Sequence, residues 1–138
     1  MTTAVRYPYL PSQTDQPTIL LPLLPLQLTS NDRSVETIGL LDSGAAVNVL
    51  PFSIGRQLGL VWEATHPEIQ LTGNLAKLPA KGVIVSAKTA HFPLVDLAFA
   101  WSQSDEVPLL LGQINFFMAF DVCFFRSQST FEIKPKSD

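Results

Sequence analysis

The chain has 138 residues, of which 46% are hydrophobic and only 15% are charged. This length is typical of one domain, and the apolar content is too high for a disordered, collagen-like or coiled-coil chain. The net charge of −3 and the pI of about 5.2 leave no excess of basic side chains to neutralise phosphates, so no nucleic-acid partner is expected.

The N-terminal part of the chain predicts an arm followed by a β-hairpin. Residues 1–17 are rich in Pro, Gln and Thr and predict a flexible arm, whereas residues 18–138 predict a single domain. Residues 18–29 are apolar, but prolines interrupt them and cannot donate to a sheet ladder, so they predict an edge or irregular strand. Turn-forming residues at 30–33 and a predicted strand at 34–41 complete the hairpin.

The rest of the chain predicts short strands with one or two short helices. After an apolar strand at 47–50, Pro51, apolar residues at helical spacing and Gly59 predict a helix of about two turns. A second short helix is predicted at 113–119. The remaining predicted strands are 69–71, 83–87, 94–101, 107–111, 120–125 and 130–133. This order predicts an all-β fold, a small closed barrel or folded sheet.

Membrane, metal-binding and disulfide-bonded proteins are not expected. The strongest apolar run, residues 19–28, has about half the ~20 residues of a membrane-spanning helix, and prolines interrupt it. The prolines near the N-terminus also leave no apolar core for a secretory signal. One cysteine, Cys123, cannot form an internal disulfide, and with two histidines it provides no zinc-ligand spacing. We therefore expect a cytoplasmic protein without metal or cofactor, in which the apolar neighbours of Cys123 predict a buried thiol.

The segment that carries chemistry is 39–51, with the sequence Gly-Leu-Leu-Asp-Ser-Gly-Ala-Ala-Val-Asn-Val-Leu-Pro. Asp42 follows an apolar strand, lies in a Ser-Gly turn and precedes a second apolar strand. A carboxylate at the end of a buried strand is costly unless it is paired or functional. The tripeptide alone favours an ordinary turn, because Asp and Ser bond local backbone and Gly accepts a positive φ.

Together with its flanks, this segment resembles the active-site loop of retropepsin-like aspartic proteases, in which two apolar residues precede Asp-Thr/Ser-Gly-Ala. A second segment, 107–114, resembles that family's apolar strand, which ends in Gly and leads into a helix. Gly112 lies about 70 residues after Asp42, a spacing that suits one lobe of the family. The resemblance covers residues 20–133 and implies a retropepsin-like acid protease fold for the domain.

The resemblance implies an aspartic endopeptidase that acts on peptides or proteins and needs no cofactor. Such enzymes use two carboxyls that share one proton, because two like charges a few Å apart do not both ionise. The chain has one Asp-Ser-Gly motif and is too short for two lobes, so the second carboxyl must be Asp42 of an identical subunit. The implied catalytic motif is Asp42, Ser43 and Gly44, with Ser43 bracing the two loops across the two-fold axis.

The resemblance also implies substrate-binding residues and a dimer contact. Ala45 follows the catalytic turn, and residues 71–76 are the candidate flap, with Thr72, Gly73 and Asn74 near its tip. A plain hairpin turn explains the candidate flap equally well. Apolar residues alternate with polar ones in the last predicted strand, 130–133, and terminal strands of the family interleave between subunits. We therefore expect this strand to contribute to the dimer.

Three apolar residues near the motif can be interpreted as subsite or as core residues, with core favoured: Leu40, Val49 and Leu111. Gln113 replaces an Arg that is typical of retroviral members, and Ala46 replaces an Asp that holds substrate backbone. These departures leave open a noncatalytic module that uses the fold to dimerise or to hold an extended peptide. An all-β domain with a coincidental Asp turn is the third interpretation, and the intact motif favours the enzyme.

Overall fold

A computed structural model describes residues 3–12, 19–71, 75 and 78–137 of the chain. Its strands are β1 (Val5–Pro8), β2 (Leu10–Pro11), β3 (Leu20–Leu21), β4 (Leu23–Ser30), β5 (Arg33–Leu41), β6 (Asn48–Leu50), β7 (Ala80–Lys88), β8 (Val95–Ser102), β9 (Leu110–Leu111), β10 (Phe120–Phe125) and β11 (Thr130–Pro135). Two short helices, α1 (Phe52–Gln57) and α2 (Phe116–Ala119), and a 3-10 turn at Arg126–Gln128 lie between them.

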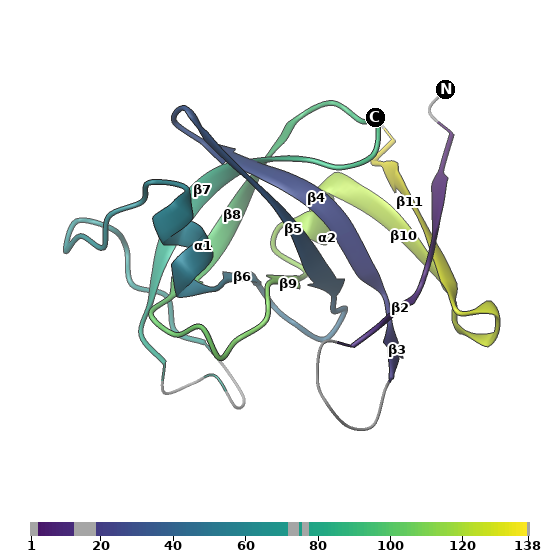
Figure 1. Ribbon diagram of the computed structural model, residues 1–138, viewed down its shortest axis with the longest axis horizontal. Coiled ribbons are helices and arrows are strands. Elements are labelled where there is room, and N and C mark those ends of the chain that lie inside the picture. The colour runs from purple at the N-terminus through teal and green to yellow at the C-terminus, as the bar shows by residue number, and fades with distance from the viewer. Residues whose placement is uncertain (1–2, 13–18, 72–74, 76–77, 138) are drawn as a thin grey trace.

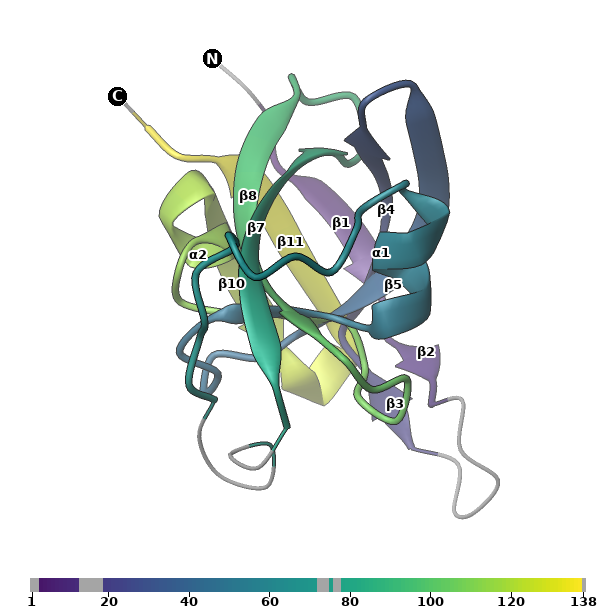
Figure 2. The ribbon, with the colours of Figure 1, turned by 90° about the vertical axis from the view of Figure 1, so that its left-hand side faces the viewer.

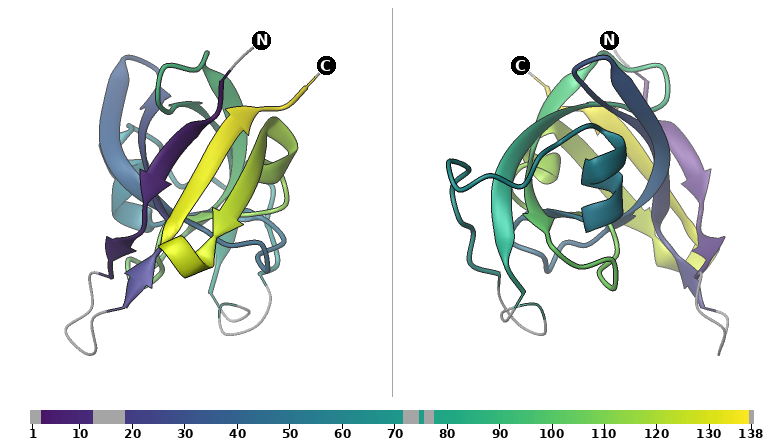
Figure 3. Two further views of the ribbon diagram at one scale, coloured as in Figure 1. Left: turned by 90° about the vertical axis from the view of Figure 1, so that its right-hand side faces the viewer. Right: turned by 60° about the vertical axis from the view of Figure 1, so that its left-hand side comes forward.

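Six strands close into a barrel in the order β4-β5-β9-β6-β8-β7. Pairing of Gln27–Thr29 of β4 with β7 closes the barrel, which Figure 3 shows end-on in its right-hand view. The core fills the barrel and continues beneath the terminal strands, with Trp101, Phe92 and Phe116 among its largest buried side chains. The prediction of an all-β closed barrel with one or two short helices is confirmed.

The hairpin β4–β5 forms as predicted, with pairs from Leu23↔Leu40 to Ser30↔Arg33. Its two-residue loop places Asn31 at φ 55°, a left-handed conformation that Asn tolerates. Of the two alternatives for the first strand, the structure shows the irregular one, because Pro22 separates β3 from β4. The edge alternative is wrong, because β4 pairs with β5 on one side and β7 on the other. Pro25 is accommodated because pairing with β7 begins only at Gln27, and the Thr89 hydroxyl donates to the Pro25 carbonyl at 2.9 Å.

The N-terminal residues expected to form a flexible arm contain β1 and the two-residue strand β2, which pairs with β3. β1 pairs with β11 in the three-stranded sheet β1-β11-β10, which crosses one side of the barrel (Figure 3, left). Tyr7 stacks on Phe131 with ring centroids 5.4 Å apart, and Arg6 forms a 2.7 Å ion pair with Glu132. Composition missed this strand because its partner, β11, lies more than 100 residues away in the sequence. Residues 13–17 of the expected arm lie outside the described residues.

The apolar face of β11 is covered by the chain itself. Phe131 and Ile133 each have 0% exposure and belong to the main core. Apolar and polar residues alternate along β11 because one face of this middle strand packs on the barrel and the other faces away. A dimer contact is not needed to explain the pattern. Cys123 was expected to be buried, but it is exposed, because β10 is the outer strand of that sheet and Cys123 is on its solvent side.

Three predicted elements are shorter in the structure or absent. Residues 69–71 form no strand and meet β7 only through the bridge Glu68↔Lys81 and adjacent hydrogen bonds. The strand predicted at 107–111 shortens to β9, because Pro108 interrupts it. The helix predicted at 113–119 begins only at Phe116, because the N–H groups of residues 113 and 114 donate to a neighbouring segment of the chain.

Helix α1 packs beside β5 and β8 at one end of the barrel, as Figures 1 and 2 show. Gly55 faces the indole of Trp101, where a Cβ would overlap the ring, so the glycine permits this close packing. Gly59 has φ +82° and ends the helical region as predicted. Trp62, on the following loop, lies edge-on to Trp101 at 5.3 Å and fixes the start of that loop.

Candidate active site

Asp42 lies directly after β5, at the point where that strand runs parallel to β9. Leu40↔Leu110 and Leu41↔Leu111 are the paired positions. The Asp42 N–H continues this pairing and donates to the Leu111 carbonyl at 3.0 Å. The backbone of Asp42 is therefore held by two buried strands that are far apart in the sequence.

The Asp-Ser-Gly segment forms a tight turn. The Gly44 N–H donates to the Asp42 Oδ1 at 2.9 Å, and the Ala45 N–H donates to the Asp42 carbonyl at 3.1 Å. The Asp42 side chain is half-buried, whereas Ser43 and Gly44 are exposed. Of the turn chemistry expected of the tripeptide, the bond from Asp to local backbone is present, whereas Gly44 does not have a positive φ. The bond from Gly44 uses one carboxylate oxygen and leaves the other free of it.

The segment after the turn crosses the second family-like segment. The N–H groups of Gln113 and Ile114 donate to the carbonyls of Ala45 and Ala46, both at 2.9 Å. A Cβ at Gly112 would lie 2.7 Å from two backbone carbonyl oxygens of the crossing segment, so only glycine permits this crossing without displacement. The two segments singled out in the sequence are thus brought together by the fold.

Gln113 has a structural partner that sequence reasoning did not identify. Its Nε2 donates to the Ser43 carbonyl at 2.7 Å. Gln113 lacks the charge of the Arg that retroviral members have at this position, but its amide reaches the Asp-Ser-Gly turn of the same chain. The Gln113 side chain therefore holds the middle residue of the Asp-Ser-Gly turn in place.

Two amides, the buried Asn48 and the half-buried Asn115, extend this support, and neither was predicted. Asn48 has 0% exposure, and its Oδ1 accepts from the Gly112 N–H at 2.7 Å. Its Nδ2 donates to the Ala98 carbonyl at 3.0 Å and to the Asn115 Oδ1 at 3.2 Å. The available signal was a polar Asn in the otherwise apolar strand 47–50, since buried polar groups need partners.

A cavity of about 270 Å³, here called the Asp42 cavity, lies beside the turn. It is lined by Asp42, Gly44, Ala45, Ala46, Val47, Val49, Gln70, Leu71, Leu75 and Leu110. Asp42 supplies the only carboxylate among these described lining residues, and the lining is otherwise largely apolar. The arrangement can place an apolar side chain next to a half-buried carboxyl.

The predicted substrate-binding residues are placed in part. Ala45 lines the Asp42 cavity together with Asp42 and Gly44, and Ser43 lies at the exposed tip between them. Thr72, Gly73 and Asn74 lie outside the described residues. Leu71 and Leu75, which flank them in the candidate flap, line the Asp42 cavity.

The three apolar residues with two interpretations divide between cavity and core. Val49 is 2% exposed and belongs to the smaller core cluster, although it also lines the cavity. Leu111 has 0% exposure in the main core, and its neighbour Leu110 lines the cavity instead. Leu40 packs against the smaller core cluster beneath the cavity. In β9, successive side chains point to opposite sides, and this decides which leucine faces the cavity.

The part of the chain that the structure describes contains neither a metal site nor a membrane-spanning helix. No three of its His, Cys, Asp and Glu side chains lie close enough together to hold a metal ion. Among the described helices, none is long and apolar enough to cross a membrane.

Comparison with known proteins supports the fold. No protein-family model matches the sequence, and no curated protein matches it. The structure of a retropepsin-like aspartic protease from Rickettsia conorii superposes with a TM-score of 0.63, covering 96% of this chain and 92% of that one at 14% sequence identity. The chain therefore has the fold of a retropepsin-like aspartic protease.

Proposed function

We propose that this chain is an aspartic endopeptidase that acts as a homodimer, with one Asp42 from each copy. The observation that carries the proposal is the half-buried Asp42 carboxyl, held by the Gly44 N–H beside an apolar cavity on a retropepsin-like fold. A carboxyl in this position can act on a peptide whose side chain fills the cavity.

The mechanism needs a second carboxyl. Two carboxyls a few Å apart hold one shared proton between them. The ionised one takes a proton from water as that water attacks the peptide carbonyl, and the other donates its proton to the carbonyl oxygen, which gives a gem-diol. The second carboxyl, now ionised, takes a proton from a diol hydroxyl while the first gives its proton to the amide nitrogen; the C–N bond breaks, the amine leaves, and the pair again holds one proton. The Asp42 cavity contains no second carboxylate among its described residues, so the partner is Asp42 of a second copy on a two-fold axis.

The exposed tip of the turn suits such pairing. Ser43 is exposed and can bond the Ser43 of the second copy, and Gly44 leaves room for substrate backbone. Ala45 contacts the substrate side chain. Residues 72–74 are proposed as the flap tip, a role supported by the two leucines that flank them in the Asp42 cavity.

The proposed partners are a second copy and a peptide or protein substrate. The net charge of −3 supports a peptide rather than a nucleic acid as the ligand. The cytoplasm remains the expected compartment, where an exposed thiol such as Cys123 stays reduced.

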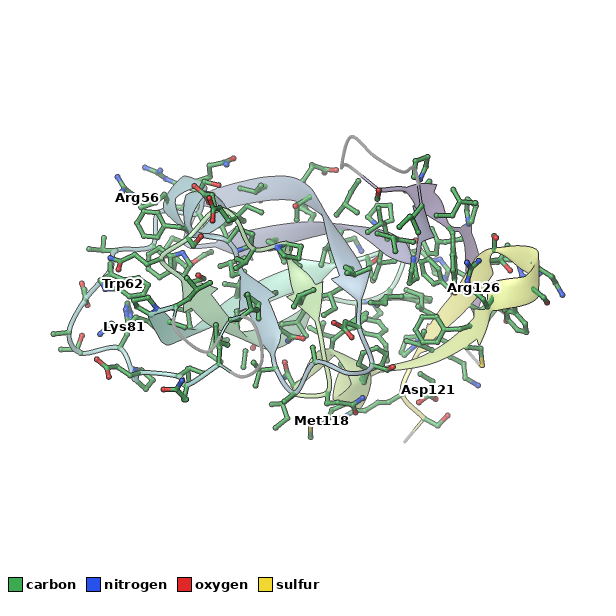
Figure 4. All side chains as sticks on the ribbon, turned by 90° about the horizontal axis from the view of Figure 1, so that it is seen from below. Arg56, Trp62, Lys81, Met118, Asp121 and Arg126 are labelled. Atoms are coloured by element: carbon green, nitrogen blue, oxygen red, sulfur yellow. The ribbon has the colours of Figure 1, made fainter. Side chains whose placement is uncertain are left out.

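A peptide-library digest tests catalysis. The purified chain is incubated with the library at several pH values and the products are read by mass spectrometry. Cleavage should fall by about 10³-fold or more in Asp42→Asn, which keeps the shape but removes the ionisable group. Asp121→Asn is the matched control, because Asp121 is exposed on β10 and does not line the cavity (Figure 4). Equal cleavage by wild type and Asp42→Asn would exclude the mechanism.

Mixing the two chains tests the shared site. If each active dimer needs two intact copies, a roughly tenfold excess of Asp42→Asn lowers the activity of exchanging wild-type chains about tenfold. Activity that is independent of added Asp42→Asn would show that one copy suffices.

A noncatalytic peptide-binding module is the second candidate function. The apolar Asp42 cavity favours it, because the cavity can hold a peptide side chain whether or not Asp42 is active. Peptide binding that is equal in wild type and Asp42→Asn, with no product from either, would select this function.

A further inference from the structure

A second and larger pocket lies on the barrel wall away from the Asp42 turn. Its floor is made by three cross-strand pairs of β7 and β8: Gly82↔Ala100, Val83↔Phe99 and Ile84↔Ala98. We call it the β7–β8 pocket. Its volume of about 580 Å³ lies within the range of roughly 300–1,000 Å³ that ligand sites occupy.

The wall of the β7–β8 pocket is held in place by the fold. Pro67 and Ile69 form it, and two backbone bonds attach their segment to β7: Gly82 N–H to the Pro67 carbonyl at 2.7 Å, and Ile69 N–H to the Ala80 carbonyl at 3.0 Å. Upstream, Trp62 contacts Trp101 edge-on, and the Lys81 Nζ lies 5.6 Å from the centre of the Trp62 ring (Figure 4). The pocket is therefore formed before any ligand arrives.

The chemistry of the lining selects an apolar ligand. Among the described lining residues, His66 is the only one with a polar side chain, and none carries a carboxylate, Lys or Arg. Ile84 and Ile114 lie at the pocket with 64% and 54% exposure. Large exposed apolar side chains around a concave site indicate a surface that is covered in the functional state.

The pocket adjoins the candidate active site and shares one lining residue with it. Val47 lines both the β7–β8 pocket and the Asp42 cavity. The segment 67–71 separates them, with Pro67 and Ile69 on the pocket and Gln70 and Leu71 on the cavity. Five residues link Asp42 to Val47, and such a segment spans at most about 17 Å when fully extended.

We infer that the β7–β8 pocket binds an apolar stretch of the peptide substrate, about five residues or fewer from the bond that is cleaved. This inference rests on the proposed function. The shared residue Val47 favours the substrate over an unrelated ligand, because a peptide lying across Asp42 and running past Val47 reaches the pocket. The concave shape also favours a peptide over a second copy. A narrow peptide can enter a concave pocket, whereas a stable interface between two proteins buries about 800 Å² of accessible surface on each partner.

Paired peptides test the inference. Peptides of about twelve residues, built on a sequence that the library digest shows to be cleaved, carry either two leucines or two aspartates near one end. Leucines that reach the pocket should raise kcat/KM about tenfold to a hundredfold over the aspartate twin. Ile84→Asp should reduce this ratio to about twofold or less. Leu94→Asp is the matched control, because Leu94 is equally exposed at 62% but does not line the pocket, and it should keep the ratio.

A binding measurement separates this inference from the failure of catalysis. In the Asp42→Asn chain with labelled isoleucine methyls, the leucine peptide should shift Ile69, Ile84 and Ile114, while Ile38 and Ile54 stay unchanged. If the digest cleaves no peptide, a leucine peptide and its aspartate counterpart are taken from the library and used only in this binding titration. Shifts without cleavage would support the pocket and reject the protease.

Two results would overturn the inference. One is cleavage or binding that does not distinguish the twins and leaves the Ile69 and Ile84 methyls unshifted. The other is a dimer that becomes monomeric in Ile84→Asp, measured by sedimentation, which would make the pocket a contact between copies.

Discussion

Around Asp42, hydrogen bonds position the turn and the segment that follows it, whereas the β7–β8 pocket is shaped by small and branched apolar side chains. The turn is attached to Gln113, and Asn48 supports the crossing behind it. The pocket instead owes its depth to the small residues Gly82, Ala98 and Ala100 on its floor. A group that performs chemistry must be positioned to fractions of an ångström, and directional bonds do this. A pocket for an apolar chain needs mainly volume, which packing provides.

Among changes that test this difference between the two regions, Gly112→Ala, at the crossing beside the Asp42 turn, should have the largest effect on stability. The new Cβ would lie 2.7 Å from the Ala45 and Val47 carbonyl oxygens, and both belong to backbone that cannot rotate away. We expect a loss of about 3 kcal/mol in the free energy of unfolding, measured by urea titration, together with loss of cleavage. Gly44→Ala is the control, because its Cβ would meet only Asp42 Oδ1 at 3.3 Å, and it should cost less. Equal losses would show that the crossing is not tightly packed.

A slightly smaller loss is expected from Asn48→Ala. This change leaves the Gly112 N–H and the Ala98 carbonyl without their buried partner. Unpaired buried groups predict a loss of about 2–3 kcal/mol in urea titration. Gln27→Ala, which removes an exposed amide bond to Glu36, should change stability by less than about 0.5 kcal/mol. An Asn48→Ala chain as stable as Gln27→Ala would contradict the buried network.

Gln113→Ala separates positioning of the turn from stability of the fold. It removes the 2.7 Å bond to the Ser43 carbonyl at an exposed site, so stability should fall by about 1 kcal/mol or less. Amide exchange at Ser43 and Gly44 should become faster, and kcat should fall about tenfold with little change in KM. Gln113→Arg retains a donor and should restore slow exchange in part. Unchanged exchange in Gln113→Ala would mean that the turn does not need this bond.

The smallest effect on stability is expected in the β7–β8 pocket. Ile84→Ser changes a side chain that is 64% exposed and should alter the free energy of unfolding by about 0.5 kcal/mol or less. Its neighbour Val83 is only 8% exposed, and Val83→Ala should lower the free energy of unfolding by about 2 kcal/mol. Thermal unfolding of the two variants checks the contrast. A large loss for Ile84→Ser would show that Ile84 stabilises the monomer and is not reserved for a ligand.

The sequence by itself determined the features that depend on neighbouring residues. The hairpin of residues 23–41, the turn at Asp42 and the helix ended by Gly59 follow from apolar period, turn chemistry and capping, all of which act over a few residues. The second segment, ending at Gly112, was found by its pattern, and the fold brings it to the Asp42 turn. The all-β class followed from the number of predicted strands, with a closed barrel and a folded sheet as the alternatives, and the pairing of β4 with β7 decided for the barrel.

Only the tertiary structure decided which distant residues meet. β1 is a strand because β11 offers it a partner, and the apolar face of β11 is buried by the same chain rather than left for a second copy. Asn48 and Gln113 acquire their roles from backbone groups about 60 to 70 residues away. The β7–β8 pocket depends on the register that places Gly82 opposite Ala100 and on the segment fixed above them. Such contacts are set by long-range pairing and packing, which local sequence patterns do not encode.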